Sequence, residues 1–196
     1  MEIFLICLMS YAIGSIPTAF IVGKLNNIDI RQHGSGNVGA TNVYRVLGKK
    51  WGSITFVFDF LKGFIPTYIS TKFFLNPYMI MLIGFLSIAG HIFTLFLSSK
   101  GGKGVATSAG VLMVITPYAL ALALITFILI TKSSGFVSLG TITATFVFMI
   151  SSILFHIKPE FRILCILISI IIFITHIPNI KRLLKGEELK YNRKEG

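Results

Sequence analysis

The sequence predicts an all-α protein, a polytopic transmembrane helix bundle of about seven spans with its N-terminus outside and its C-terminus cytoplasmic. Of its 196 residues, 54% are hydrophobic and 13% are charged, and the mean hydropathy is +0.84. An ordinary soluble domain carries about 25% charged residues, so this chain has too little polar surface to face water on all sides. A bilayer removes that problem, because apolar side chains can face its hydrocarbon core.

The apolar runs of the sequence set the expected spans. In chain order they lie at residues 3–23, 52–74, 78–98, 105–131, 135–155 and 161–176. A crossing helix needs about 20 residues, so a first count gives six spans. The run over 105–131 is longer than one span needs and contains Pro117, which disfavours helix at the residue before it and lacks a backbone donor. We therefore divide it into helices at about 104–115 and 117–131, which makes seven.

The distribution of basic residues supports that division. Lysine and arginine gather in the loop over 24–51, in the loop over 99–104 and in the tail after residue 176. Basic loops stay on the cytoplasmic side of a membrane, so all three segments are predicted to face the cytoplasm. Seven spans allow this arrangement, whereas six would put the basic tail outside. The break at Pro117 therefore places the three basic segments on one side of the membrane.

The length and the net charge of the chain limit its expected number of domains and its expected binding partners. We expect one integral membrane domain over 1–196, with residues 177–196 as a cytoplasmic basic tail. A net charge of +11 in a soluble protein would suggest nucleic acid, but here the basic residues lie between apolar runs. We therefore expect membrane lipid and an anionic substrate as partners, and no nucleic acid. No metal and no cofactor are expected, because no group of His, Cys, Asp or Glu has metal-ligand spacing and both cysteines lie in apolar runs.

A first motif, HGSGNVGATN over 33–42, is followed by Arg45. Its glycines, which permit tight turns and close approach of a ligand to the backbone, are Gly34, Gly36 and Gly39. Neutral hydrogen-bonding side chains come from Ser35, Asn37, Thr41 and Asn42. Arginine adds a fork of donors suited to phosphate, so we interpret the segment as an anion cradle; the alternative is a tight interhelical loop with polar caps. The match to G-x-G-x-x-G is rejected as a dinucleotide motif because no strand of a βαβ unit precedes it.

A second motif, KGGKGVAT, leads directly into a predicted helix. It begins with Lys100, Gly101, Gly102, Lys103 and Gly104. Helix N-termini present unpaired N–H groups and the positive end of the helix dipole, which favour phosphate. The spacing is not that of a Walker A loop. The alternative interpretation is a flexible basic loop beneath lipid headgroups.

A third motif, HIPNIKRLLKGEE, covers residues 176–188. His176 lies where the last span meets the interface, and Asn179 follows within one helical turn. The alternative is an interfacial helix whose polar side chains reach back to the headgroups.

Two further polar features accompany the three motifs. Asp59 and Lys62 lie three residues apart inside the second span, where charges are costly, so we expect them to pair; structural pairing and substrate contact both remain open. His91, in the third span, is expected to be a hydrogen-bonded packing residue. Ser138, in a Ser/Gly-rich turn, is a candidate donor to the same site as the motifs.

The three motifs, together with DFLKG at 59–63, resemble the signatures of the bacterial membrane acyl-phosphate:glycerol-3-phosphate acyltransferase family (PlsY). The resemblance covers nearly the whole chain, and the order and spacing of the motifs are more specific than any one string. It implies transfer of a fatty acyl group from acyl phosphate to the 1-position of glycerol 3-phosphate, which gives lysophosphatidic acid and phosphate for phospholipid biosynthesis. It also implies the cytoplasmic membrane of a bacterium, with functional coupling to the enzyme that makes acyl phosphate. Pro178 departs from the family's third motif, in which a charged residue is more usual.

The resemblance also suggests roles for residues. It implies that Ser35 and Arg45 are needed for activity and that His176 and Asn179 are catalytic or orient the substrate; we add Asn37 to this catalytic group. The expected substrate-binding residues are Gly34, Gly36, Gly39, Thr41, Asn42, Lys100, Gly101, Gly102, Lys103, Gly104 and Ser138. The expected structural residues are Glu188, Asp59 and Lys62.

The chemistry leaves the general base undecided. The acyl-phosphate carbonyl is already activated, and no Ser-His-Asp arrangement surrounds Ser35, so a covalent enzyme intermediate is not required. The proton of the glycerol hydroxyl passes either to His176 or to the phosphate of the donor. A different class of function is a transporter or channel for a phosphorylated solute. Against it, the polar motifs lie in predicted cytoplasmic loops, whereas transporter sites lie near the membrane midplane.

Overall fold

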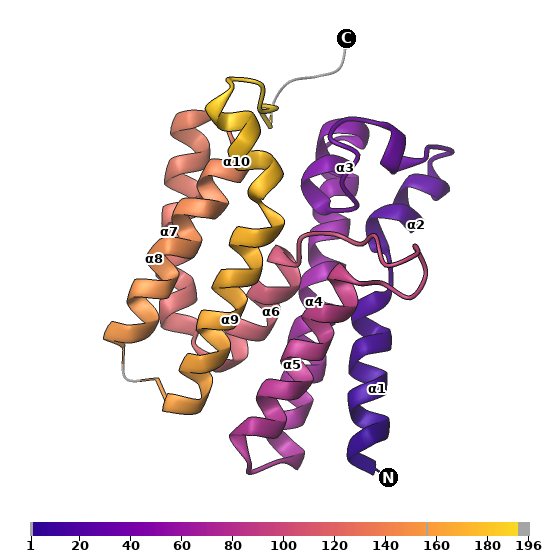
Figure 1. Ribbon diagram of the computed structural model, residues 1–196. Helices are drawn as coiled ribbons and strands as arrows, with labels where there is room; N and C mark the ends of the chain where they lie inside the picture. Colours follow the sequence, from indigo (N-terminus) through magenta and orange to yellow (C-terminus); the bar gives the residue numbers. More distant parts are fainter. Residues whose placement is uncertain (1, 156, 192–196) are drawn as a thin grey trace. The chain divides into compact units, whose positions relative to one another are not determined.

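A computed structural model describes residues 2–155 and 157–191, and the end of the predicted basic tail, residues 192–196, lies outside the described part. The described chain is helical and contains no strand, which confirms the all-α prediction (Figure 1). It divides into two compact units, one ending at Val114 and the other beginning at Ile115. The expectation of one domain over 1–196 stays a prediction.

The first unit opens with a bent pair of helices. α1 (Glu2–Ser15) and α2 (Thr18–Leu25) meet at an angle of 41°. The apolar run over 3–23 had predicted one continuous span. Pro17, which lacks a backbone N–H, stands at the break, so the run is continuous in hydropathy but not in helical hydrogen bonding.

Short helices follow in a segment for which the sequence predicts a loop. η1 (Ile30–Gln32) and α3 (Ala40–Leu47) both lie within the predicted loop over 24–51. Their anchor is an apolar cluster made of Ala19, Val22, Ile30, Val38, Val43 and Leu97. The cluster joins parts of the chain that are distant in sequence. The hydropathy of the sequence does not indicate α3, because one face of this helix is polar. Its helical state depends on packing against this cluster.

Three longer elements complete the unit: α4 (Lys49–Phe73), α5 (Pro77–Ile92) and α6 (Val105–Ile115). Glycines let them approach closely. A Cβ added at Gly110 would lie 2.1 Å from the carbonyl oxygen of Phe60, and one added at Gly63 would lie 2.0 Å from that of Thr107. Small residues at such crossings are how membrane helices pack backbone against backbone.

The second unit contains α7 (Pro117–Ser134), α8 (Val137–Leu154), α9 (Pro159–Thr175) and α10 (Ile177–Leu184). Pro117 is the first residue of α7, so the predicted break after residue 115 is confirmed as a break between helices. Gly135, in the left-handed conformation with φ 81°, ends α7 and allows the turn into α8. α9 and α10 meet at an angle of 51° at His176.

Helix length and composition give part of the predicted membrane topology. Of the described helices, α7 and α8 are each long and apolar enough to cross a membrane, and the pairs α1 with α2 and α9 with α10 qualify if each bent pair is one span. α5 and α6 are apolar but shorter. Many large apolar side chains are exposed along the helices, as lipid contact requires. The count of seven spans and the orientation of the termini stay predictions.

Candidate active site

The first motif is held in shape by the buried amide of Asn42, which lies on α3. Its Oδ1 accepts a hydrogen bond from the backbone N–H of Ser35 at 2.8 Å. Its Nδ2 donates to the carbonyl oxygens of Ile30 and His33 at 3.1 and 3.0 Å. One side chain that is 1% exposed thus closes the loop over 33–42 on three backbone groups. Asn42 was expected to bind substrate, and these contacts make it the residue that shapes the loop.

The glycines of this motif fit the tight turns that the sequence predicted. Gly34 and Gly36 have φ values of 59° and 69°, a region that other residues rarely adopt. Gly39 stands at the N-cap of α3, where an added Cβ would lie 2.8 Å from Nδ2 of Asn37. The side chain of Asn37 therefore lies over the start of this helix.

Thr41 and Arg45 share one face of α3, because they are four residues apart on the helix. Thr41 lies in the first turn, where backbone N–H groups and the helix dipole favour an anion. Both side chains are half-buried. A hydroxyl, a helix start and a guanidinium on one face are groups that can bind phosphate.

The second motif packs on the C-terminal end of α5. The N–H groups of Gly101 and Gly102 donate to the carbonyl oxygens of Ile92 and His91 at 3.0 and 3.1 Å. A Cβ added at Gly101 would lie 2.0 Å from the carbonyl oxygen of His91. The absence of a side chain at these glycines therefore lets the loop pack closely on α5. Their N–H groups already donate to α5 and are not available to a phosphate. A phosphate at this loop would meet the positive charge of its lysines and the N-terminal end of α6, where the helix dipole is positive.

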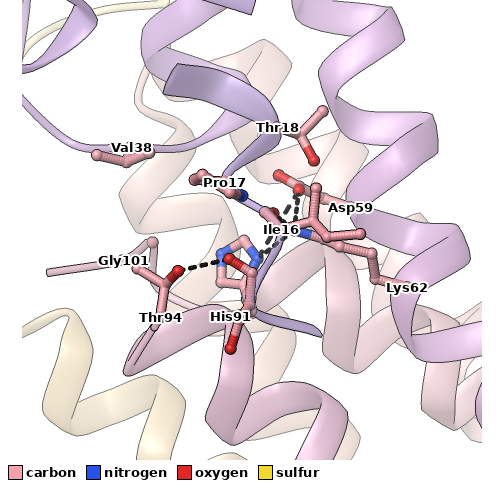
Figure 2. Close-up of a pocket in the computed structure, with 11 residues that line it drawn as sticks. Ile16, Pro17, Thr18, Val38, Asp59, Lys62, His91, Thr94 and Gly101 are labelled. Carbon is pink, nitrogen blue, oxygen red and sulfur yellow. Dashed lines mark hydrogen bonds and ion pairs between the residues drawn. The ribbon is translucent and has the colours of Figure 1, made fainter. Parts of the chain in front are cut away.

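A buried cluster of Asp59, Lys62 and His91, on α4 and α5, lines the same pocket as Gly101 and Gly102 of this loop (Figure 2). Nζ of Lys62 lies 2.7 Å from Oδ1 of Asp59 and donates to the carbonyl oxygen of Ile16 at 2.7 Å. Nδ1 of His91 is 3.3 Å from the same ammonium. Asp59 and Lys62 are paired, as the sequence predicted.

A small cavity adjoins the cluster, and residues of the first two motifs both line it. Its lining includes Val38 of the first motif, Gly101 and Gly102 of the second, and His91 (Figure 2). Its volume is about 10 Å³, close to the minimum that holds one water molecule. A Cβ added at Gly102 would lie 2.6 Å from the carbonyl oxygen of Val38, so the two loops meet at this point.

In the second unit, Glu188 is the centre of a separate polar group. Its Oε1 accepts from Oγ of Ser138 at 2.9 Å and from Nδ2 of Asn179 at 2.7 Å, and its Oε2 accepts from Nε of Arg182 at 2.7 Å. Three donors from α8 and α10 thus surround one buried carboxylate. Burial by itself would raise the pKa of Glu188, but the hydrogen bonds from Asn179, Arg182 and Ser138 outweigh it and hold that pKa below its usual value.

His176 occupies the bend between α9 and α10 and is buried. Its Nδ1 lies 2.8 Å from the carbonyl oxygen of Ile172. A carbonyl oxygen can only accept, so Nδ1 carries the proton of this hydrogen bond. In the neutral ring, Nε2 then has the lone pair, as a general base requires.

The structure brings the predicted residues together in two groups, one in each unit. The first contains the motifs over 33–45 and 100–104, and the second contains Ser138, Asn179 and Glu188. Sequence reasoning missed Arg182 and the connection of His91 to Lys62. The i, i+3 spacing of Asp59 and Lys62 predicts their ion pair, but no local sequence pattern predicts a contact with a residue on another helix. The roles assigned to individual site residues stay predictions.

Comparisons with known proteins agree over nearly the whole chain. Residues 4–186 match the family model described as glycerol-3-phosphate acyltransferase. A glycerol-3-phosphate acyltransferase of Fusobacterium nucleatum is 41% identical over 192 residues, which are 97% of this chain and 99% of the relative. One of Aquifex aeolicus is 39% identical and covers 97% of this chain and 100% of the relative.

A solved structure is also similar. It is the glycerol 3-phosphate form of PlsY, an integral membrane glycerol 3-phosphate acyltransferase, with a TM-score of 0.93 and 37% identity. The match covers 97% of this chain and 96% of that one. The lysophosphatidic acid form of the same enzyme gives a TM-score of 0.90.

The Glu188 group predicts a pH-dependent stability. Glu188→Gln leaves three donors facing a neutral amide, so we expect the free energy of unfolding to fall by about 2 kcal/mol at pH 7. Because the folded pKa is lowered, the stabilisation is present above the ordinary glutamate pKa of about 4.3 and is lost as pH falls through the lower folded value. Thermal unfolding in detergent at several pH values measures both effects.

The matched control is Glu187→Gln, which removes the same charge at an exposed neighbouring position. It should leave the unfolding temperature nearly unchanged at every pH. Equal stability of the Glu188→Gln variant and the wild type at pH 7 would contradict the structural role of this carboxylate.

Proposed function

The chain belongs to the glycerol-3-phosphate acyltransferase family of integral membrane enzymes, and from that premise we propose that its acyl donor is acyl phosphate. The 1-hydroxyl of glycerol 3-phosphate attacks the carbonyl carbon of the donor and forms an ester bond. The bond from that carbon to the phosphate oxygen breaks, inorganic phosphate leaves and a base takes the hydroxyl proton. The product is lysophosphatidic acid, which serves phospholipid biosynthesis.

The observation that carries this proposal is the meeting of two phosphate-suited segments in the first unit. The 33–45 and 100–104 segments are far apart in sequence, yet Val38 and Gly102 line one cavity. Each segment has cationic side chains and the start of a helix, and both reactants of the proposed reaction carry phosphate. Apolar helices adjoin them, which suits a donor with a fatty chain.

The residues of these two segments suit electrostatic catalysis. We propose that Arg45 and Lys103 bind phosphate, and that Ser35, Asn37 and Thr41 supply neutral donors to phosphate and to the oxyanion that forms as the hydroxyl attacks. The glycines, with Asn42, give the loops their shape. Lys100 is exposed and adds positive charge for the approach of the anionic substrates.

For the base, we propose His176 in preference to the phosphate of the donor. The hydrogen bond from its Nδ1 to Ile172 leaves the lone pair on Nε2. Asn179 is one turn along and is oriented by Glu188, so it is proposed to orient the substrate. Ser138 donates to the same carboxylate and is proposed to assist in that orientation.

We further propose that the enzyme lies in the cytoplasmic membrane of a bacterium with its active site facing the cytoplasm. The concentration of basic residues in the 24–51 and 99–104 segments and in the tail supports that orientation. Functional coupling to the enzyme that makes acyl phosphate follows from the chemistry, because this mixed anhydride is reactive toward water. The transporter alternative loses support, because the matched relatives are acyltransferases.

The donor is tested by exchanging it in an assay of the purified protein. With palmitoyl phosphate and glycerol 3-phosphate we expect lysophosphatidic acid and one equivalent of phosphate. With palmitoyl-CoA we expect no product above background. Mass spectrometry of the lipid and a phosphate assay give the two readouts, and product from the thioester alone would refute the proposed donor.

Arg45 is tested by Arg45→Ala. We expect kcat/KM for glycerol 3-phosphate to fall at least a hundredfold with little change in unfolding temperature, since a charge-assisted phosphate contact is lost. Arg31→Ala is the control, because Arg31 lies in the same basic segment over 24–51 but is exposed and pairs with Asp29. Unchanged kinetics of Arg45→Ala would remove Arg45 from the site.

His176 is tested by His176→Asn, whose amide can still donate to Ile172 but has no group at the Nε2 position. A general base contributes about 10²–10⁴ in rate, so kcat should fall within that range while KM changes little. The control is His33→Asn at an exposed histidine. A loss in kcat of less than tenfold would assign the proton to the donor's phosphate instead.

A further inference from the structure

The buried ammonium of Lys62 fixes the protonation of His91. Lysine has only donors: Nζ of Lys62 donates to the Ile16 carbonyl, forms an ion pair with Oδ1 of Asp59 and lies 3.3 Å from Nδ1 of His91. Nδ1 therefore accepts, and the proton of the neutral ring lies on Nε2. The second contact of Nδ1, 3.8 Å from Oδ1 of Asp59, is too long for a hydrogen bond that would reverse this assignment.

The Nε2 side of His91 faces the junction of the two phosphate-suited segments. A Cβ added at Gly102 would lie 2.2 Å from Nε2 and 2.6 Å from the carbonyl oxygen of Val38. A donor on α5 and an acceptor on the first motif thus flank the same glycine of the second motif. His91 is 7% exposed, so this N–H lies at the cavity and away from bulk solvent.

The size of the cavity decides what can lie there. At about 10 Å³ it suits one water molecule and is too small for a phosphate group. A water needs polar partners, and Nε2–H and the Val38 carbonyl offer one donor and one acceptor. Figure 2 shows His91, Val38 and Gly101 around this space.

We propose that His91 is a positioning residue for substrate binding. Its Nε2–H bonds to the Val38 carbonyl through one water in this cavity, and its own carbonyl accepts from the N–H of Gly102, so His91 connects the two segments and sets the geometry in which they hold glycerol 3-phosphate. The inference rests on the proposed function, in which these segments bind that substrate. His91 itself touches the loop and not the reacting atoms.

Two substitutions at His91 separate its two nitrogens. Asparagine places an acceptor near Nδ1 and loses the Nε2 donor, whereas glutamine reaches the Nε2 position with an N–H donor and loses the Nδ1 acceptor. For His91→Asn we expect KM for glycerol 3-phosphate to rise about five- to tenfold, with kcat and unfolding temperature nearly unchanged. For His91→Gln we expect KM near the wild-type value and a lower unfolding temperature, because Lys62 loses an acceptor.

The assay measures lysophosphatidic acid from palmitoyl phosphate at varied glycerol 3-phosphate, with Lys103→Ala beside the two variants. A normal KM for Lys103→Ala would contradict the proposed role of the loop. A raised KM for Lys103→Ala with a normal KM for His91→Asn would contradict the positioning role alone. Parallel changes of KM and unfolding temperature in both His91 variants would show a merely structural role.

A test without a variant covers the case in which His91→Asn does not fold. A crystal structure of the wild-type enzyme should have density for one water within hydrogen-bonding distance of His91 Nε2 and the Val38 carbonyl oxygen. A well-resolved junction without that density would overturn the proposal.

Discussion

The first unit depends on one buried cation. Lys62 is 6% exposed, and an ammonium in such surroundings is tolerated only when hydrogen-bond acceptors and an opposite charge compensate it. Its partners come from three places: the carbonyl of Ile16 at the break between α1 and α2, the carboxylate of Asp59 on the same helix, and His91 on α5. Satisfying this charge therefore fixes three backbone segments relative to one another.

The position of the phosphate-suited loops follows from that arrangement. His91 is held by Lys62, and the second motif is held by the carbonyl oxygens of His91 and Ile92. Val38 lies at the same junction, and the loop that contains it is closed by the amide of Asn42. A charge in the interior of the unit thus supports both loops, through the contacts of His91 with Lys62 and with the second loop.

The second unit also contains a buried charge that its neighbours compensate, but this charge is negative. The carboxylate of Glu188 is surrounded by donors from Ser138, Asn179 and Arg182, which join α8, α10 and the segment after α10. Removal of one partner from a buried charge leaves an uncompensated group, so each cluster stabilises its unit as a whole. Each unit also holds one histidine in a single orientation.

The sequence predicted what depends on local composition. The apolar runs, the helix break at Pro117 and the three motifs were all visible, because hydropathy and proline act over neighbouring residues. The bend at Pro17 and the helix α3 were not, since a run can stay apolar across a break and a polar helix can be stabilised by distant packing. The contacts of Lys62 with Ile16 and of Ser138 with Glu188 join distant positions, and one sequence gives no signal for such pairs.

These partners hold two buried histidines in opposite tautomers: His91, proposed to position a loop, and His176, proposed as the base. Long-range ¹H–¹⁵N spectra of the histidine-labelled enzyme at neutral pH test this tautomer assignment directly, with His91→Asn and His176→Asn giving the assignments among the four histidines. We expect a proton on Nε2 of His91 and on Nδ1 of His176. A proton on Nδ1 of His91, or on Nε2 of neutral His176, would contradict it.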